Sequence, residues 1–220
     1  MDKRFSMGEA VSFGWETMKR NLGFFIALLI ISGAISLLFN GLQEASSNGP
    51  FGIKAVIWLV SLFVETVISI GMLKVAIKFS NNEKGSFDDF FPVSFSTFFN
   101  YFFASLLYGM IILGGILLLV VPAFIWGIQF GYYGYLIVDK QTMIMDSLQK
   151  SSEITRGAKG DIFVFNILLF VINLAGVLCL FVGLFATVPT TMIASAYVYK
   201  RLRDLTGERP FQTAGGAQLK

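Results

Sequence analysis

Glu65 is the side chain in this sequence best placed to do chemistry, because it is ionisable and lies in the middle of a long apolar segment. Lys54 and Lys74 are the nearest basic residues, and along a helix they would lie about 16 and 13 Å away, too far for an ion pair. An ionisable residue at the centre of a bilayer is costly and indicates a functional site. Because desolvation disfavours a carboxylate, we expect Glu65 to be protonated, hydrated or hydrogen-bonded to a neutral polar group.

Neutral polar residues in this and other apolar segments could line a polar path or pocket together with Glu65. Ser61 and Ser69 lie one helical turn to either side of it, on the same face. Such a path would pass a proton, an ion or a small polar solute. The alternative is that these side chains hold neighbouring helices together, which is the common use of polar groups in helical bundles. The candidates are Glu65, Ser61, Ser69, Gln129, Asn166 and Asn173.

The residues that common enzyme mechanisms require are missing from the sequence. It has no His, the commonest metal ligand and general base, and its single Cys, Cys179, lies in an apolar stretch. It also has no Walker glycine loop and no Cys-x-x-Cys pair. We therefore predict no catalytic residue, no metal site and no cofactor, and we rank a membrane-embedded enzyme third among the candidate functions.

The composition indicates that these residues belong to a membrane protein. Of the 220 residues, 55% are hydrophobic and 14% are charged, whereas a soluble domain has about 25% charged residues. The mean hydropathy is +0.71. The net charge of +3 could suggest a nucleic-acid partner, but its distribution is better explained by orientation in a bilayer. We predict an all-α integral membrane protein with membrane lipids as partners and no nucleic acid.

Uncharged stretches separated by polar turns predict six membrane-spanning helices in three hairpins. A span needs about 20 apolar residues, and the uncharged stretch 90–138 is long enough for two. Residues 1–205 then form one polytopic domain, and 206–220, rich in Gly, Ala and Gln, form a disordered cytoplasmic tail. The expected spans are about 21–42, 51–79, 96–119, 121–139, 161–182 and 184–202.

An amphipathic helix that lies in the membrane interface is expected before each hairpin. The first begins with a capping box formed by Ser6 and Glu9. A short second one follows Ser86, and the third covers 143–156. The side of this third helix that would face the membrane consists of Ile144, Leu148, Ser151 and Thr155.

The distribution of Lys and Arg orients the predicted spans. With six spans, nearly all basic residues fall on one side, and the opposite turns near 43–50, 114–122 and 176–186 contain none. Because cytoplasmic loops are enriched in Lys and Arg, we expect both termini in the cytoplasm of a bacterial cell, with the chain in the inner membrane. An odd number of spans would place a basic cluster outside.

Repeated sequence supports the hairpins. The segment 113–121 aligns with 174–182 at a constant offset, and 31–39 is a weaker third copy. In the fourth span, Gly127 and Gly131 form a small-xxx-small motif, which lets helices approach closely. We expect this motif to serve packing within the bundle, with homodimerisation as the alternative.

A family resemblance rests on residues in the second half of the chain. They are Tyr135 to Asp139 (YLIVD), Ser147, Leu148, Ser151, Gly157, Val182, Gly183, Pro189, Ala194 to Tyr199 (ASAYVY) and Leu202. In these residues the chain resembles uncharacterised bacterial multi-span membrane proteins, including the membrane domain attached to some glycerophosphoryl diester phosphodiesterases. The resemblance covers about 130–205 and implies six spans with surface helices. It implies no reaction, because in the fused proteins the phosphodiesterase activity belongs to a separate soluble barrel.

Together these observations favour a non-enzymatic polytopic membrane protein that acts as a scaffold or accessory factor, through lipids, a partner protein or a second copy of itself. The alternative is a small permease or channel-like transporter that uses Glu65 at the membrane midplane. A transporter needs a hydrated cavity at Glu65 that opens to each side in turn, and a scaffold does not. The surroundings of Glu65 therefore discriminate between the two hypotheses.

Overall fold

The computed structural model of the chain describes residues 4–90, 94–118 and 120–207, and every regular element in those ranges is a helix. This confirms the predicted all-α class. Apart from Thr206 and Gly207, the predicted tail 206–220 lies outside the described residues. The elements are α1 (Met7–Arg20), α2 (Leu22–Ala45), α3 (Phe51–Ser80), the 3₁₀-helix η1 (Phe87–Phe90), α4 (Phe95–Leu117), α5 (Val120–Phe130), α6 (Tyr133–Lys140), α7 (Ile144–Ile154), α8 (Lys159–Leu178) and α9 (Leu184–Leu205).

Within the described residues, five segments are long and apolar enough to cross a membrane: α2, α3, α4, the consecutive pair α5–α6 and α8. The chain is thus a polytopic membrane protein by helix length and hydropathy. The sixth predicted span, 184–202, is helical as α9 but is not among these five. Three Thr residues, Pro189 and the basic stretch from Lys200 to Arg203 make α9 more polar than the other long helices. A sixth crossing therefore stays a prediction.

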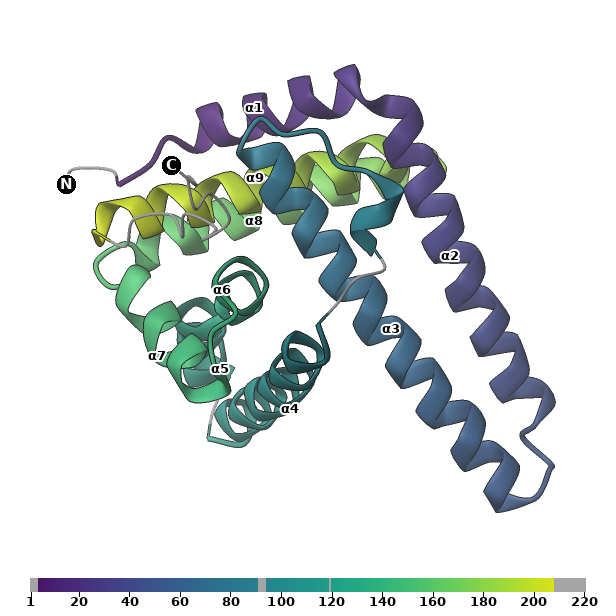
Figure 1. Cartoon of the computed structure of the whole chain (residues 1–220). Coiled ribbons are helices and arrows are strands. Elements are labelled where there is room, and N and C mark those ends of the chain that lie inside the picture. Colours follow the sequence, from purple (N-terminus) through teal and green to yellow (C-terminus); the bar gives the residue numbers. More distant parts are fainter. Residues whose placement is uncertain (1–3, 91–93, 119, 208–220) are drawn as a thin grey trace, which may run out of the picture.

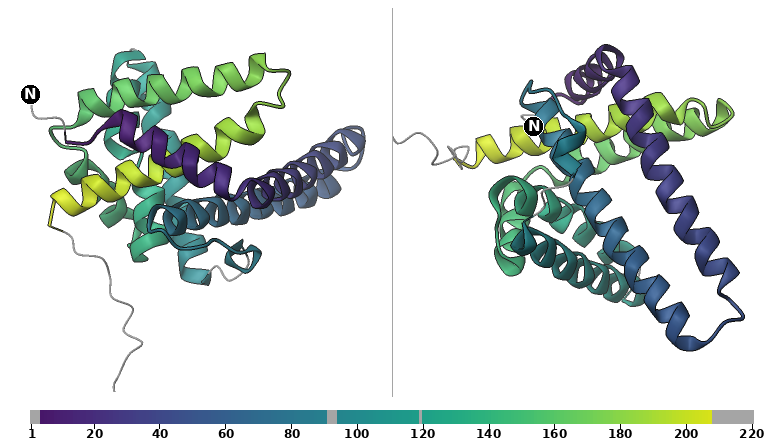
Figure 2. Two further views of the ribbon diagram at one scale, coloured as in Figure 1. Left: turned by 90° about the horizontal axis from the view of Figure 1, so that it is seen from above. Right: turned by 45° about the vertical axis from the view of Figure 1, so that its right-hand side comes forward.

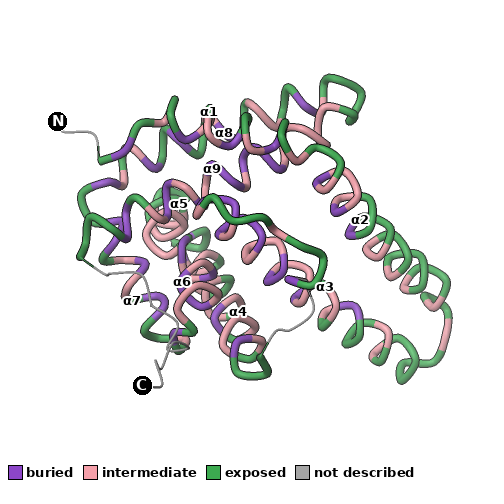
Figure 3. The backbone as a smooth tube through the Cα atoms, turned by 45° about the horizontal axis from the view of Figure 1, so that its top comes forward, coloured by how far each residue is buried: buried purple, intermediate pink, exposed green. Residues whose placement is uncertain are grey.

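The long helices form three antiparallel hairpins, α2–α3, α4–α5 and α8–α9, as predicted. Figure 1 shows that the α2–α3 hairpin projects away from the rest of the molecule, and Figure 2 shows the same from two further directions. The end of this hairpin is largely exposed, whereas buried residues gather where α3, α8 and α9 meet the other helices (Figure 3). The core of the described chain therefore lies at one end of the hairpins.

Helix α1 lies along α9, and the two helices run in opposite directions (Figure 1). The Ser6 half of the predicted capping box forms, since the Ser6 hydroxyl accepts a hydrogen bond of 3.3 Å from the Glu9 N–H, whereas the Glu9 carboxylate binds Tyr197 and Arg201. Gly14 approaches the backbone of Thr190 and Ala194 so closely that a Cβ atom would clash with it. The buried side of this amphipathic helix therefore packs against protein, where a helix lying free in the membrane interface was expected.

The α8–α9 hairpin turns tightly near Gly183, as predicted from its short length. Gly176 would clash with Thr187 of the returning helix if it carried a Cβ atom, and Gly115 would clash in the same way with Ala123. These two glycines hold equivalent positions in the aligned segments 113–121 and 174–182. Gly33, the corresponding residue of the third copy, has open space around it. Only the first two copies therefore share this close helix contact.

A buried ion pair joins α6 to α9. The Arg203 guanidinium donates a hydrogen bond of 2.6 Å to Asp139, and the Tyr199 hydroxyl donates one of 2.9 Å to the same carboxylate oxygen. The Arg203 side chain is only 4% exposed and that of Asp139 18%. Because a buried charge without a partner is costly, this contact strongly favours one arrangement of α6 against α9.

We expect Asp139→Ala to destabilise the protein by about 1–3 kcal/mol, because the buried Tyr199 hydroxyl loses its acceptor, whereas Arg203 keeps its pair with Asp204 at 2.9 Å. The measurement is thermal unfolding of the purified protein in detergent micelles. Glu16→Ala is the matched control, because Glu16 pairs with Arg20 at 3.7 Å on the exposed surface, where an ion pair contributes about 0–1 kcal/mol. Equal stability losses in the two variants would contradict this role for Asp139.

Candidate functional site

Glu65 lies near the middle of α3, with its side chain exposed on the surface of the protein. Its backbone carbonyl accepts a hydrogen bond of 2.9 Å from the Ser69 hydroxyl. Within the described part of the chain, the Glu65 carboxylate itself has no hydrogen-bond or ion-pair partner. The sequence left open whether Glu65 has a polar or charged partner. Among the described residues, its carboxylate has none.

Ion pairs mark one end of the apolar part of α3. Asp89 of η1 accepts a hydrogen bond of 2.5 Å from Lys78 and lies 4.0 Å from Lys74. Its other carboxylate oxygen accepts a 2.7 Å bond from the Ser86 N–H. Partial burial of Asp89 opposes its ionisation, but the Lys78 ammonium and the Ser86 N–H outweigh this effect and lower the pKa of Asp89 below its usual value. These contacts attach η1 to the end of α3.

Gln129 lies at the break between α5 and α6, where its side chain and backbone both contact the following helices. Its side-chain amide donates to the Ser152 hydroxyl at 2.9 Å and accepts from the Lys159 ammonium at 2.6 Å. The Ser151 hydroxyl donates to the Gln129 carbonyl at 3.0 Å and accepts from the Tyr132 N–H at 3.1 Å. Side chains of α7 thus satisfy backbone groups that the broken helix leaves free.

Asp146 and Glu153 of α7 are exposed, as predicted, but the prediction that the opposite side of this helix faces the membrane was wrong. Leu148, Ser151 and Thr155 on that side are buried against protein. Thr155 also donates a 3.2 Å hydrogen bond to the Gln129 carbonyl. The polarity of the Ser151 and Thr155 hydroxyls is the physical reason, because they match the free backbone groups of the α5–α6 break and would gain nothing from contact with lipid.

The two glycines of the small-xxx-small motif have different roles. Gly127 faces α4, where the Tyr108 hydroxyl donates a 3.2 Å hydrogen bond to the Gly127 carbonyl. A Cβ atom at Gly131 would clash with that same carbonyl, one turn earlier in its own segment. Gly127 therefore packs within the bundle, as expected, and Gly131 permits the break before α6.

The remaining candidates each have separate surroundings. Ser61 accepts a 3.0 Å hydrogen bond from Gln43 near the α2–α3 turn. Asn173 of α8 donates a 3.2 Å hydrogen bond to Thr191 of α9. Asn166 is exposed in an apolar groove, which is described below. Because different helices supply the partners of these side chains, the structure does not gather the six candidates into one polar cluster.

Several tyrosines form contacts between helices that the sequence did not indicate. Tyr132, which is buried, and Tyr135, which is partly buried, pack against Tyr199 at ring distances of 6.3 and 5.2 Å. Tyr133 packs against Tyr101 of α4 at 5.9 Å. These rings join α4, α6 and α9, so they act mainly in packing between helices.

Two apolar grooves separate the hairpins. The first, the α2–α4 groove, lies between α2, α3 and α4 and has a volume of about 660 Å³. The second, the α4–α8 groove, lies between α4, α5 and α8 and has a volume of about 650 Å³. The first is lined by Leu28, Ile35, Val64, Val67, Phe95 and Phe98, among others. The second is lined by Ile112, Ile116, Phe124, Phe163, Ile167 and Phe170, with Tyr108 and Asn166 as polar members.

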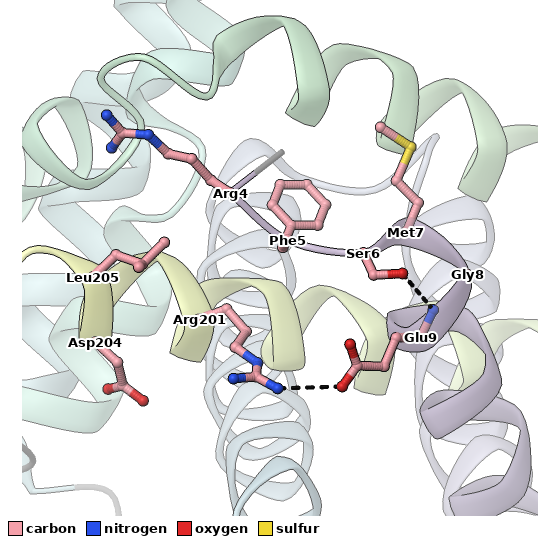
Figure 4. Close-up of a pocket in the computed structure, with 9 residues that line it drawn as sticks. All are labelled: Arg4, Phe5, Ser6, Met7, Gly8, Glu9, Arg201, Asp204 and Leu205. Carbon is pink, nitrogen blue, oxygen red and sulfur yellow. Dashed lines mark hydrogen bonds and ion pairs between the residues drawn. The ribbon is translucent and has the colours of Figure 1, made fainter. Parts of the chain in front are cut away.

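A third hollow, of about 550 Å³, lies where α1 begins and α9 ends (Figure 4). Glu9 binds both the Tyr197 hydroxyl and the Arg201 guanidinium here. The hydrogen bond from Tyr197, and the charge of Arg201, lower the pKa of Glu9 against the effect of desolvation. Figure 4 shows Arg4 directed away from Arg201. The two guanidinium groups therefore do not converge on a shared anion, and the contacts serve to join α1 to α9.

No group of His, Cys, Asp and Glu side chains in the described ranges could hold a metal ion. No family model, curated protein or solved structure matches this chain. Of the residues that carry the family resemblance, Leu136, Ile137, Ser147, Ser151, Ala194 and Tyr199 are buried, whereas Val182 is 71% exposed. That resemblance remains a prediction.

We expect Ser151→Ala to destabilise the protein by about 1–3 kcal/mol, because the buried N–H of Tyr132 loses its hydrogen-bond partner. Thermal unfolding in detergent measures the effect. Ser105→Ala is the control, because the Ser105 hydroxyl bonds only within its own helix, to the Phe102 carbonyl. A Ser151 variant as stable as the control would show that α7 does not support the break between α5 and α6.

Proposed function

We propose that this chain is a non-enzymatic membrane protein that acts as a scaffold or accessory factor by binding membrane lipids between its hairpins. The observation that carries the proposal is the pair of apolar grooves, which are lined by helices of membrane-spanning length. An empty apolar groove loses dispersion contacts along its walls. In a bilayer, lipid acyl chains are the apolar groups at hand to fill these grooves.

We further propose that α9 is a sixth crossing, with both termini in the cytoplasm of a bacterial cell and the chain in its inner membrane. Polar residues within membranes usually face the interior of the bundle, and Thr190, Thr191 and Arg203 of α9 are all buried. Because protein surrounds these side chains, α9 could cross without being as apolar as a lipid-facing helix. The placement of Lys and Arg on one side supports the orientation.

Lipid binding is tested by filling the grooves. Val67→Trp fills the α2–α4 groove and Ile167→Trp the α4–α8 groove, so we expect each to lower the number of phospholipids retained by the detergent-purified protein. Native mass spectrometry counts the bound lipids. Val171→Trp is the matched control, because Val171 is 52% exposed on α8 and lines neither groove. Lipid retention that is the same in all three variants would overturn the proposal.

The alternative function, a permease or channel, is favoured by the position of Glu65 alone. If Glu65 faces lipid, a thiol at this position is not ionised by water and should not react with a charged, membrane-impermeant reagent. We therefore expect no labelling of Glu65→Cys in a Cys179→Ala background, from either side of the membrane. Ser47→Cys, in the exposed α2–α3 turn, provides the positive control. Labelling at position 65 would favour the transporter, because it requires water at the middle of α3.

A further inference from the structure

We propose that the exposed side of α3 around Glu65 binds a transmembrane helix of another protein, and that this partner helix carries a Lys or Arg near the middle of the membrane. The docking surface consists of Trp58, Leu62 and Glu65, which succeed one another at intervals of three or four residues on one face of α3. Ser69, one turn further on, contacts Tyr101 of α4 and marks the edge of this surface. The inference rests on the proposed scaffold function and specifies one partner for it.

The charges on α3 place Glu65 near the midplane of the bilayer. Lys54 and Lys74 are 20 residues apart (74 − 54), and a helix of that length extends about 30 Å, the thickness of the hydrocarbon core. Lys74 lies at the end held by Asp89. Glu65 is 11 residues from Lys54 and 9 from Lys74, so both ends of the apolar segment are about equally far from its carboxylate.

The described residues supply no cation at this depth. The segments 21–43, 90–138 and 162–199, which contain most of the other long helices, have no charged residue. Lys78 is bound to Asp89 at the end of α3. No basic residue in the described ranges pairs with Glu65, so a counter-charge for its carboxylate would come from another molecule.

A cationic partner lowers the free energy of both chains. A carboxylate or an ammonium at the centre of a membrane-spanning helix is costly. Two such groups that meet in the bilayer neutralise each other, and each then has a hydrogen-bond partner. A second copy of this chain fits less well, because a two-fold contact through this face would place two Glu65 carboxylates against each other.

The shape of α3 leaves room for such a helix on one part of its length. Trp58 is 55% exposed and lies two turns before Glu65, where it can cover the side of a docked helix. Towards Ser80 the helix is covered, since Ala76 is fully buried and Lys200 of α9 donates to the Ser80 carbonyl at 3.4 Å. The docking surface therefore occupies the part of α3 that lies away from α9.

The test uses a model transmembrane peptide, a Leu/Ala-rich helix with one central Lys, and an identical peptide with Leu in its place. Energy transfer in lipid vesicles, from a dye on Ser47→Cys in a Cys179→Ala background, reports binding of each peptide. We expect the Lys peptide to bind at least tenfold more tightly than the Leu peptide. Glu65→Leu should abolish the difference, and Trp58→Ala should weaken the binding of both peptides. Equal binding of the two peptides to the unmodified surface would overturn the proposal.

Two controls separate this site from simpler explanations. The double variant Glu65→Leu/Val171→Glu moves the carboxylate from α3 to the exposed side of α8. We expect this variant to bind the Lys peptide at least fivefold more weakly than the protein that retains Glu65. If the double variant binds the Lys peptide as tightly as the protein that retains Glu65, any lipid-facing carboxylate is sufficient for binding. That result would contradict a specific docking surface on α3. If two copies of the protein show energy transfer with each other, and Glu65→Leu abolishes it, the occupant of this surface is a second copy and the proposed partner helix is wrong. We expect Glu65→Leu to retain as many lipids as the unchanged protein. Lipid retention therefore tests the groove proposal independently of the Glu65 proposal.

Discussion

The packing of α9 against its neighbours is the constraint on which the rest of the structure depends. Helix α9 contacts α1, α2, α3, α7 and α8, and its residues Tyr199 and Arg203 bind Asp139 of α6. The least apolar of the long helices is therefore the one surrounded by protein. The buried Arg203 pairs with Asp204 of its own helix and with Asp139 of α6, and the second pair limits how α6 and α9 can be placed.

Several polar groups in the long helices join elements. Asn173 binds Thr191 across the α8–α9 hairpin, and Gln129 binds Ser152 and Lys159. In an apolar solvent an unpaired amide or hydroxyl is costly, and other hydroxyls, such as those of Thr66 and Ser105, donate to a carbonyl of their own helix. This use of polar residues favours the interpretation as contacts between helices over a continuous polar path.

Glu65 differs from these residues because its carboxylate is exposed and has no partner among the described residues. The grooves between the hairpins also lack a partner within the described chain, since their apolar walls are uncovered. Both features are incomplete in the isolated protein and would be completed by the membrane. Lipid chains suit the grooves, and a cationic partner helix suits Glu65, so the proposed scaffold function explains the two features together.

The sequence by itself determined the helical class, the hairpins and most helix ends. Long uncharged stretches can satisfy their backbone groups in lipid only as helices, and turn residues such as Gly183 mark where they end. The N-cap at Ser6 was predictable for the same local reason. Tertiary structure alone decided that protein covers the inward side of α7, that α9 lies centrally, and which partners Gln129 and Asn173 bind. These depend on which helices meet, and hydrophobic periodicity cannot distinguish a face covered by lipid from a face covered by protein.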